Sequence, residues 1–264
     1  LTGIHVASYG KDLKGLTLLD VIKAVSEIDG IKRIRLGSIE PRIMTEEFIS
    51  ELASIDKMCN HFHISLQSGC DETLKRMNRK YTTDEYYKIV EGLRKHFPEV
   101  AITTDIMVGF PGETDEEFED TLSLVKEVGF TSLFTFIFSP RKGTKAYDMP
   151  DPVSREEKGK WFSELLQAQE KVAQENINKF IGKTFRVLCD DYSQRQGYMT
   201  GHTSGTAVIE FEADESLLGK FVDIKVESYD NGLCGKIRLC AVPAEELLEI
   251  EYRSELKKQG KRNG

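Results

Sequence analysis

Short apolar runs alternate with longer amphipathic segments through the first half of the chain, and this alternation limits the fold more than any other feature. The apolar runs, which we expect to form strands, are residues 1–8, 31–39, 61–66, 100–110 and 131–138. Apolar residues at helical spacing lie between them, at residues 16–28, from residue 45, at 71–77, at 83–96 and from residue 114. Such alternation builds a parallel sheet from βα units, which either curls into a partial barrel or stays open and doubly wound.

The pattern changes after the break at Pro150-Asp151-Pro152. Residues 154–180 indicate one long polar helix, and four runs of period-two spacing follow, at 184–189, 206–212, 221–226 and 235–240. We therefore expect an α/β domain over residues 1–180, a small all-β domain over 181–244 and a polar tail over 245–264 with a short helix at 245–251. Thr83 and Thr114 are predicted helix N-caps, and Glu117 gives Thr114 the spacing of a capping box.

Composition narrows the classes of protein that this chain can belong to. The net charge is −8, so overall charge does not hold the chain to nucleic acid, and any RNA contact must come from local patches. The five cysteines include no Cys-x-x-Cys pair, which predicts a cytoplasmic protein without a disulfide framework. We expect no membrane span and no signal peptide. Because Leu1 lies inside an apolar run, we also expect a truncated chain.

Each predicted strand ends in polar or glycine-rich residues, and the carboxyl ends of parallel strands are where ligands bind. The end residues are Ser8-Tyr9-Gly10, Ser38 with Glu40 to Arg42, Gln67 to Cys70, Gly109 to Glu113, and Ser139 to Thr144. Backbone amides that a ligand can approach closely, beside a few charged groups, suit a polar, nucleotide-like ligand.

Plain structural interpretations stand beside these functional ones. Gly-Phe-Pro-Gly at 109–112 is by itself more consistent with a strand-to-helix turn, Glu40 can equally face solvent, and Gln67 to Gly69 can equally cap a helix. Asp105 lies inside an apolar strand, and because buried carboxylates are uncommon we expect it to point into a site. His61 and His63 share a strand face without a third ligand, so we expect structural roles and no metal site.

At these strand ends the sequence resembles the methylthiotransferase family of radical-SAM enzymes. The matching elements are Leu1 to His5 with Ser8-Tyr9-Gly10, Arg33-Ile34-Arg35 with Ser38 to Pro41, Leu66 to Gly69, Thr104-Asp105 with Val108 to Thr114, and Phe138 to Thr144. The β unit is similar to the TRAM domain, a small RNA-binding barrel, at Gly182-Lys183, Gly197, Gly201, Thr203, Phe211, Leu218 to Lys220 and Val222. The resemblance implies a truncated radical-SAM partial (β/α) barrel followed by a small all-β TRAM barrel.

The resemblance implies an enzyme that adds a methylthio group to C2 of an adenosine in tRNA. The opening Leu-Thr-Gly-Ile-His and the Ser-Ile-Glu-Pro element look most like the branch that acts on N6-threonylcarbamoyladenosine next to the anticodon. The isopentenyladenosine branch is expected to differ at both places. The alternatives are an enzyme acting on an aspartate of ribosomal protein S12 and a non-catalytic RNA-binding α/β protein.

The family's cofactors are S-adenosylmethionine and two [4Fe-4S] clusters in the full-length protein. One cluster, held by three cysteines after the first strand, generates a 5′-deoxyadenosyl radical, and the second, in an amino-terminal domain, handles sulfur. This chain lacks both cysteine sets, so we expect the fragment to ligate neither cluster and to be inactive alone. The expected partner is tRNA, the electron and sulfur donors are unknown, and a monomer is expected.

Roles carry over from the family to matching residues one at a time. The resemblance implies that Gln67 and Ser68 bond the ribose or carboxylate of S-adenosylmethionine, and that Val108 with the turn Gly109-Phe110-Pro111-Gly112 packs against its adenine. Asp105 and Glu40 are the predicted catalytic residues, which orient cofactor or substrate. Arg141 is predicted to pair with the methionyl carboxylate.

The TRAM-like segment is not a basic domain, since residues 182–243 hold seven lysines and arginines against nine acidic residues. The predicted RNA-binding residues, which we expect to share one face, are Lys183, Arg186, Arg195, His202, Lys220, Lys236 and Arg238. Phosphate contacts of this kind predict binding that weakens with salt.

Overall fold

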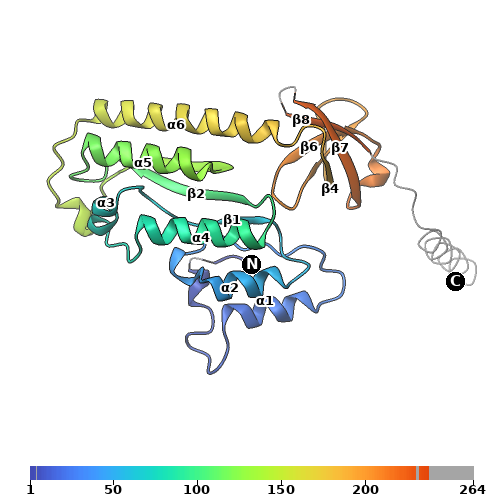
Figure 1. The fold of residues 1–264 in the computed structure, drawn as a ribbon, viewed down its shortest axis with the longest axis horizontal. Coiled ribbons are helices and arrows are strands. Elements are labelled where there is room, and N and C mark those ends of the chain that lie inside the picture. The colour runs from blue at the N-terminus through green and yellow to red at the C-terminus, as the bar shows by residue number, and fades with distance from the viewer. Residues whose placement is uncertain (4, 230–231, 238–264) are drawn as a thin grey trace, which may run out of the picture. The chain divides into compact units, whose positions relative to one another are not determined.

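The computed structural model describes residues 1–3, 5–229 and 232–237 (Figure 1). By internal contacts the chain divides into two compact units, the first made of Leu1–Ile181 with His202–Val208 and the second of Gly182–Gly201 with the residues from Ile209 onward. The domain boundary expected after residue 180 stays a prediction. The expected tail, with its helix at 245–251, lies outside the described residues.

Helices cover much of the first unit. They are α1 (Leu18–Ser26), α2 (Glu46–Ala53), α3 (Asp71–Arg76), α4 (Thr83–His96), α5 (Asp115–Val128) and α6 (Arg155–Asn178), with short 3-10 turns at Val6–Ser8, Pro41–Ile43 and Lys145–Tyr147. The predicted capping box of Thr114 and Glu117 at the start of α5 is confirmed. The prediction of Thr83 as a cap is wrong, because Thr82 caps α4 with Glu85 while the Thr83 amide donates to Asp71 Oδ1.

Three parallel strands form the sheet of the first unit, in the order β1 (His61–His63), β2 (Ala101–Val108) and β3 (Ser132–Ile137). The predicted strand at 31–39 is wrong in extent, because only isolated bridges from Ile34 to Met58 and from Ile39 to Ile64 pair it with the neighbouring segment. The predicted strand at 1–8 is also wrong, because residues 1–3 belong to no strand and Val6–Ser8 form a 3-10 turn. There the Ser8 amide donates to the His5 carbonyl and closes a turn.

Side chains of β2 alternate between two faces of the sheet. Ile106 and Val108 are buried in one core with Leu93 of α4 and Leu122 of α5. The opposite face carries Thr103, Asp105 and Met107, of which the last two are only partly buried. Among the described residues no helix is long and apolar enough to cross a membrane.

The second unit contains most of a closed barrel with the strand order β4-β5-β6-β8-β7. Its strands are β4 (Thr184–Tyr192), β5 (Tyr198–His202), β6 (Val208–Glu212), β7 (Phe221–Tyr229) and β8 (Leu233–Ile237). The strand β5 was not predicted from the sequence, because the glycine at position 201 is typical of a turn between strands. A Cβ at Gly201 would lie 2.4 Å from the Leu188 carbonyl oxygen, so only glycine allows β4 to pass this closely.

Candidate functional site

The end of β1 is bent by a shift in strand register. His63 pairs with Thr103, but Gln67 pairs with Ile106, so four residues on one chain segment match three on the other. The hydroxyl of Thr104 repairs the interruption, since it donates to the Ile64 carbonyl at 2.6 Å and accepts from the Leu66 amide at 2.9 Å. The extra residue turns the chain toward the segment that follows.

Two tyrosine hydroxyls donate hydrogen bonds to backbone carbonyl groups of the bend. Tyr81 donates to the Leu66 carbonyl at 2.8 Å, and Tyr86 donates to the Ile64 carbonyl at 2.9 Å. Tyr86 is fully buried, and burial holds the pKa of its phenol far above the ordinary value. With the Thr104 hydroxyl, these bonds satisfy the Ile64 and Leu66 carbonyls and the Leu66 amide within the chain.

Gln67 and Ser68 follow the bend and face different surroundings. Gln67 adopts a positive φ of 77° and its backbone bonds to Asp105 and Met107 of β2, while its side chain is partly exposed. Ser68 is fully buried, and its hydroxyl accepts from the Cys70 amide and lies 3.3 Å from the Thr121 hydroxyl. Gln67 is therefore open to a ligand, whereas Ser68 fixes the loop against α5.

The turn after β2 is closed by a buried carboxylate. Glu113 Oε2 accepts from the amides of Gly109 and Phe110, at 2.5 and 3.1 Å, and its other oxygen has no partner among the described residues. Burial raises the pKa of Glu113 to about 7. Glu113 was named among the strand-end residues in sequence but given no role, and its only signal is a carboxylate directly after a glycine-rich turn.

A lysine of α6 packs over the same turn. The aliphatic chain of Lys158 lies so near Gly109 that a Cβ there would be 2.5 Å from Lys158 Cδ. Lys158 is buried and its ammonium pairs with Asp151. Sequence reasoning missed this contact, because nothing in the polar helix pattern marks one lysine as buried. Val108, Phe110 and Pro111 of the predicted site are likewise buried, and Gly112 is partly exposed.

Asp105 lies on the face of β2 opposite the core and is partly buried, and its place in a site stays a prediction. Its Oδ2 lies 3.2 Å from His63 Nε2 and accepts from the Ser65 hydroxyl at 3.0 Å. Burial alone would raise the pKa of Asp105, but the hydrogen bonds from His63 and Ser65 lower it below its ordinary value. The carboxylate is therefore ionised at neutral pH. His63 and His61 both bond the Thr103 hydroxyl, and burial beside Arg35 lowers the pKa of His61 to about 4.

The other predicted residues lie along the same edge of the sheet. Parallel bridges join Ile39 to Ile64 and Gln67 to Ile106, and the Phe138 amide donates to the Val108 carbonyl. The ends of these neighbouring segments therefore lie side by side. This order places Glu40, Gln67, Gly109 and Arg141 after successive segments of the first unit. Glu40 is partly buried beside His5, and the Arg141 side chain is exposed. The role of each residue stays a prediction.

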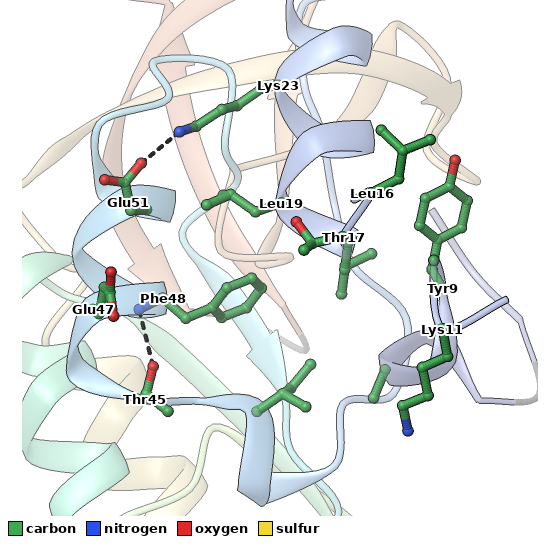
Figure 2. Close-up of a pocket in the computed structure, with 14 residues that line it drawn as sticks. Tyr9, Lys11, Leu16, Thr17, Leu19, Lys23, Thr45, Glu47, Phe48 and Glu51 are labelled. Carbon is green, nitrogen blue, oxygen red and sulfur yellow. Dashed lines mark hydrogen bonds and ion pairs between the residues drawn. The ribbon is translucent and has the colours of Figure 1, made fainter. Parts of the chain in front are cut away.

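Two cavities of the described part of the chain lie beside other residues. One, of about 570 Å³, lies between the starts of α1 and α2 and is closed at one end by an ion pair from Lys23 to Glu51 at 2.6 Å (Figure 2). Figure 2 shows the ring of Phe48 pointing toward Thr17. The other, of about 480 Å³, is lined by residues that include Gly69, Cys70 and Asp120. Neither cavity contains Gln67, Gly109 or Asp105 in its lining.

Three of the predicted RNA-binding residues contact other side chains of the barrel. Arg186 pairs with Asp223 at 3.3 Å, Lys236 pairs with Glu227 at 3.0 Å, and the Arg195 guanidinium lies 3.8 Å from the centre of the Tyr198 ring. Lys183 and Lys220 are exposed, His202 ends β5, and Arg238 lies outside the described residues. Lys225 was omitted from the prediction, yet it lies in register between Thr184 of β4 and Lys236 of β8.

The described residues do not offer the ligand set of an iron–sulfur cluster. Cys59, Cys70, Cys189 and Cys234 are free thiols. No group of three or more His, Cys, Asp or Glu side chains within the described part of the chain is placed to hold a metal ion.

Residues 4–125 match the model of the radical SAM superfamily, and residues 178–232 match that of the TRAM domain. Together with the α/β sheet and the closed barrel, these matches define the class of protein as a radical-SAM core followed by a TRAM domain. The fold class predicted from sequence is confirmed.

The chain is similar to the tRNA-2-methylthio-N(6)-dimethylallyladenosine synthase of Caldicellulosiruptor saccharolyticus, with 41% identity over 239 residues, or 90% of this chain and 51% of that protein. The protein of the same name from Acetivibrio thermocellus is 40% identical over 230 residues, or 86% of this chain and 48% of that protein. The chain thus spans about half the length of the curated relatives it matches. It belongs to the radical-SAM methylthiotransferase family, as the resemblance predicted.

The names of the relatives bear on the predicted substrate branch. The expected threonylcarbamoyladenosine branch is not supported, because these relatives are named for dimethylallyladenosine. Among solved structures, coproporphyrinogen III oxidase from Escherichia coli, described as a radical SAM enzyme, aligns with a TM-score of 0.48 and 13% identity over 71% of this chain and 50% of that one.

Proposed function

We propose that the protein containing this chain adds a methylthio group to C2 of an N6-modified adenosine in tRNA. The observation that carries the proposal is the 41% identity to a tRNA methylthio synthase over a span that includes both the radical-SAM core and the TRAM domain. The relatives favour N6-dimethylallyladenosine as the substrate. The elements Leu1 to His5 and Ser38 to Pro41 favour N6-threonylcarbamoyladenosine.

We propose that S-adenosylmethionine lies at the strand ends. The fit rests on the partly exposed side chain of Gln67, the left-handed glycines Gly109 and Gly112, and the buried Glu113 oxygen that has no partner in the described part of the chain. In this arrangement Gln67 and Arg141 hold the polar parts of the cofactor, and Glu113 keeps the turn at 109–112 in shape beneath its base. When bound in the complete enzyme, the cofactor supplies the radical chemistry of the family.

We propose that tRNA contacts the outer surface of β4, β7 and β8. Arg186, Lys225 and Lys236 project from neighbouring strands there, and Asp223 and Glu227 reduce the positive charge. Contacts of this kind are electrostatic, so the affinity of the chain for tRNA should fall as salt rises. The reversal of charge in Lys225→Glu should weaken binding more than Lys171→Glu on α6.

The substrate proposal is tested by expressing the complete gene product in bacteria whose tRNA lacks methylthio groups. The nucleosides of digested tRNA are then separated and identified by mass spectrometry. The proposal expects a methylthio derivative of either dimethylallyladenosine or threonylcarbamoyladenosine, and the ratio of the two assigns the substrate. A gene product that is expressed with intact clusters and leaves both nucleosides unmodified would contradict the proposal. The cytoplasmic location and the monomeric state expected from sequence stay predictions.

A further inference from the structure

The sheet of the first unit exposes two aromatic side chains on its open face. Phe134 and Phe136 of β3 are 53% and 52% exposed. They lie two residues apart and therefore on the same face of the strand. In a parallel sheet both faces are usually covered, so exposed phenylalanines on the face that bears Asp105 call for a binding partner.

Asp105 lies in the same patch. It is in register with Phe134, and Met107 is in register with Phe136. The His63 ring packs edge-on against Phe134, with 5.4 Å between ring centres. His63 and Ser65 contact only Oδ2 of Asp105, so among the described residues Oδ1 has no partner and can accept a hydrogen bond.

The patch therefore combines two aromatic surfaces, a thioether and one fixed carboxylate. Aromatic side chains stack on nucleobases, and stacking contributes about 1–3 kcal/mol for each base. A carboxylate accepts a hydrogen bond and repels phosphate, which favours a base edge that carries an N–H. The apolar Met107 and Phe136 suit an aliphatic substituent on that base.

We propose that Phe134, Phe136 and Asp105 bind the N6-substituted adenine, with the Asp105 carboxylate accepting from its N6–H. This inference rests on the proposed function for the choice of adenine. His63 and Ser65 act as positioning residues, because they hold one carboxylate oxygen and leave the other for the base. Leu133 and Thr135, which alternate with the two phenylalanines, face the other side of the sheet and take no part.

The test measures binding of the nucleoside N6-dimethylallyladenosine to the 264-residue chain by saturation-transfer NMR. Phe134→Ala and Phe136→Ala should each weaken binding roughly tenfold, and Phe134→Tyr should retain it because the ring remains. Leu166→Ala, at an exposed apolar residue of α6, is the matched control and should change nothing. Equal affinities for the wild type and the two alanine variants, or no binding up to the solubility limit, would overturn the inference.

A second probe isolates the hydrogen bond. N6,N6-dimethyladenosine has no N6–H, so Asp105→Asn should weaken binding of N6-dimethylallyladenosine several-fold and leave binding of the disubstituted nucleoside unchanged. An equal effect on both nucleosides would remove the assigned role of Asp105. If the nucleoside binds as described but the complete enzyme never methylthiolates tRNA, the proposed function fails and the nucleoside site stands. If the enzyme methylthiolates tRNA equally well with Phe134→Ala and Phe136→Ala, the adenine site fails alone.

Discussion

The imidazole Nε2 of His5 lies 3.2 Å from Oε2 of Glu40 and so joins two segments that are 35 residues apart in sequence. The Gly37 amide also donates to the Leu1 carbonyl at 2.7 Å. These are the two segments whose sequence predicted the substrate branch. These two contacts hold the segments against each other, so a change in either can affect the other.

The pair of His5 and Glu40 should affect substrate preference more than stability. Both side chains are partly exposed, and such pairs contribute at most about 1 kcal/mol. Glu40→Gln should therefore lower the free energy of unfolding in urea by less than about 1 kcal/mol. Under the proposed function, it should also change which of the two N6-modified adenosines in tRNA is methylthiolated. Glu47→Gln, at an exposed residue of α2, should change neither quantity.

Removing the Thr104 hydroxyl should destabilise the bend after β1. Thr104→Val leaves the buried Leu66 amide without a hydrogen-bond acceptor and removes a donor to the Ile64 carbonyl. An unmade buried hydrogen bond costs about 1–3 kcal/mol, so the free energy of unfolding should fall by about that amount. Thr135→Val on β3 is the control, since its hydroxyl makes no such bond among the described residues. A Thr104→Val protein as stable as the control would show that the bend does not depend on this hydroxyl.

Glu113 should make stability depend on pH. Its pKa is raised from 4.5 to about 7, so the folded chain holds the proton more tightly than the unfolded chain. The stabilisation is complete below about pH 4.5 and is lost as pH rises to about 7, by roughly 3 kcal/mol. Urea unfolding at several pH values should show this loss in the wild type and in Glu119→Gln, but not in Glu113→Gln. Parallel pH curves for all three proteins would contradict the account.

Alanine substitutions at three glycines distinguish the cost of backbone strain from the cost of steric crowding. Gly109→Ala places a Cβ at φ +72° and 2.5 Å from Lys158 Cδ, whereas Gly129→Ala meets only the unfavourable φ of +62° with open space around it. We expect Gly129→Ala to cost about 1 kcal/mol and Gly109→Ala clearly more, in thermal or urea unfolding. Gly159→Ala, inside α6 with open space, should stabilise the chain by up to about 1 kcal/mol. Equal costs at Gly109 and Gly129 would show that Lys158 moves aside freely.

Regular features of the first unit were predictable because they repeat in sequence. The apolar spacing predicted α4 with the bounds of the structure, and the Thr114 and Glu117 pair predicted how α5 begins. The strand β2 was predicted from its run of β-branched residues.

Features that depend on contacts between distant segments were not predictable. The shift in register at Gln67 depends on Thr104 of β2, Tyr86 of α4 and Tyr81 of the connection before α4. The burial of Lys158 depends on the turn at Gly109, which lies far earlier in the chain. Residues 31–39 have the composition of a strand, yet they pair with the segment around β1 at isolated positions alone.

Chemical-shift mapping with S-adenosylmethionine tests the central claim most directly, namely that the strand ends form the cofactor site. The ligand is added to the isotope-labelled 264-residue chain, and the backbone amide shifts are followed. The account predicts saturable shifts at Gln67, Gly109, Phe110 and Gly112, and weaker binding in Gln67→Ala. Shifts gathered instead around Tyr9, Thr17 and Phe48, in the cavity between α1 and α2, or no shifts up to the solubility limit of the ligand, would contradict it.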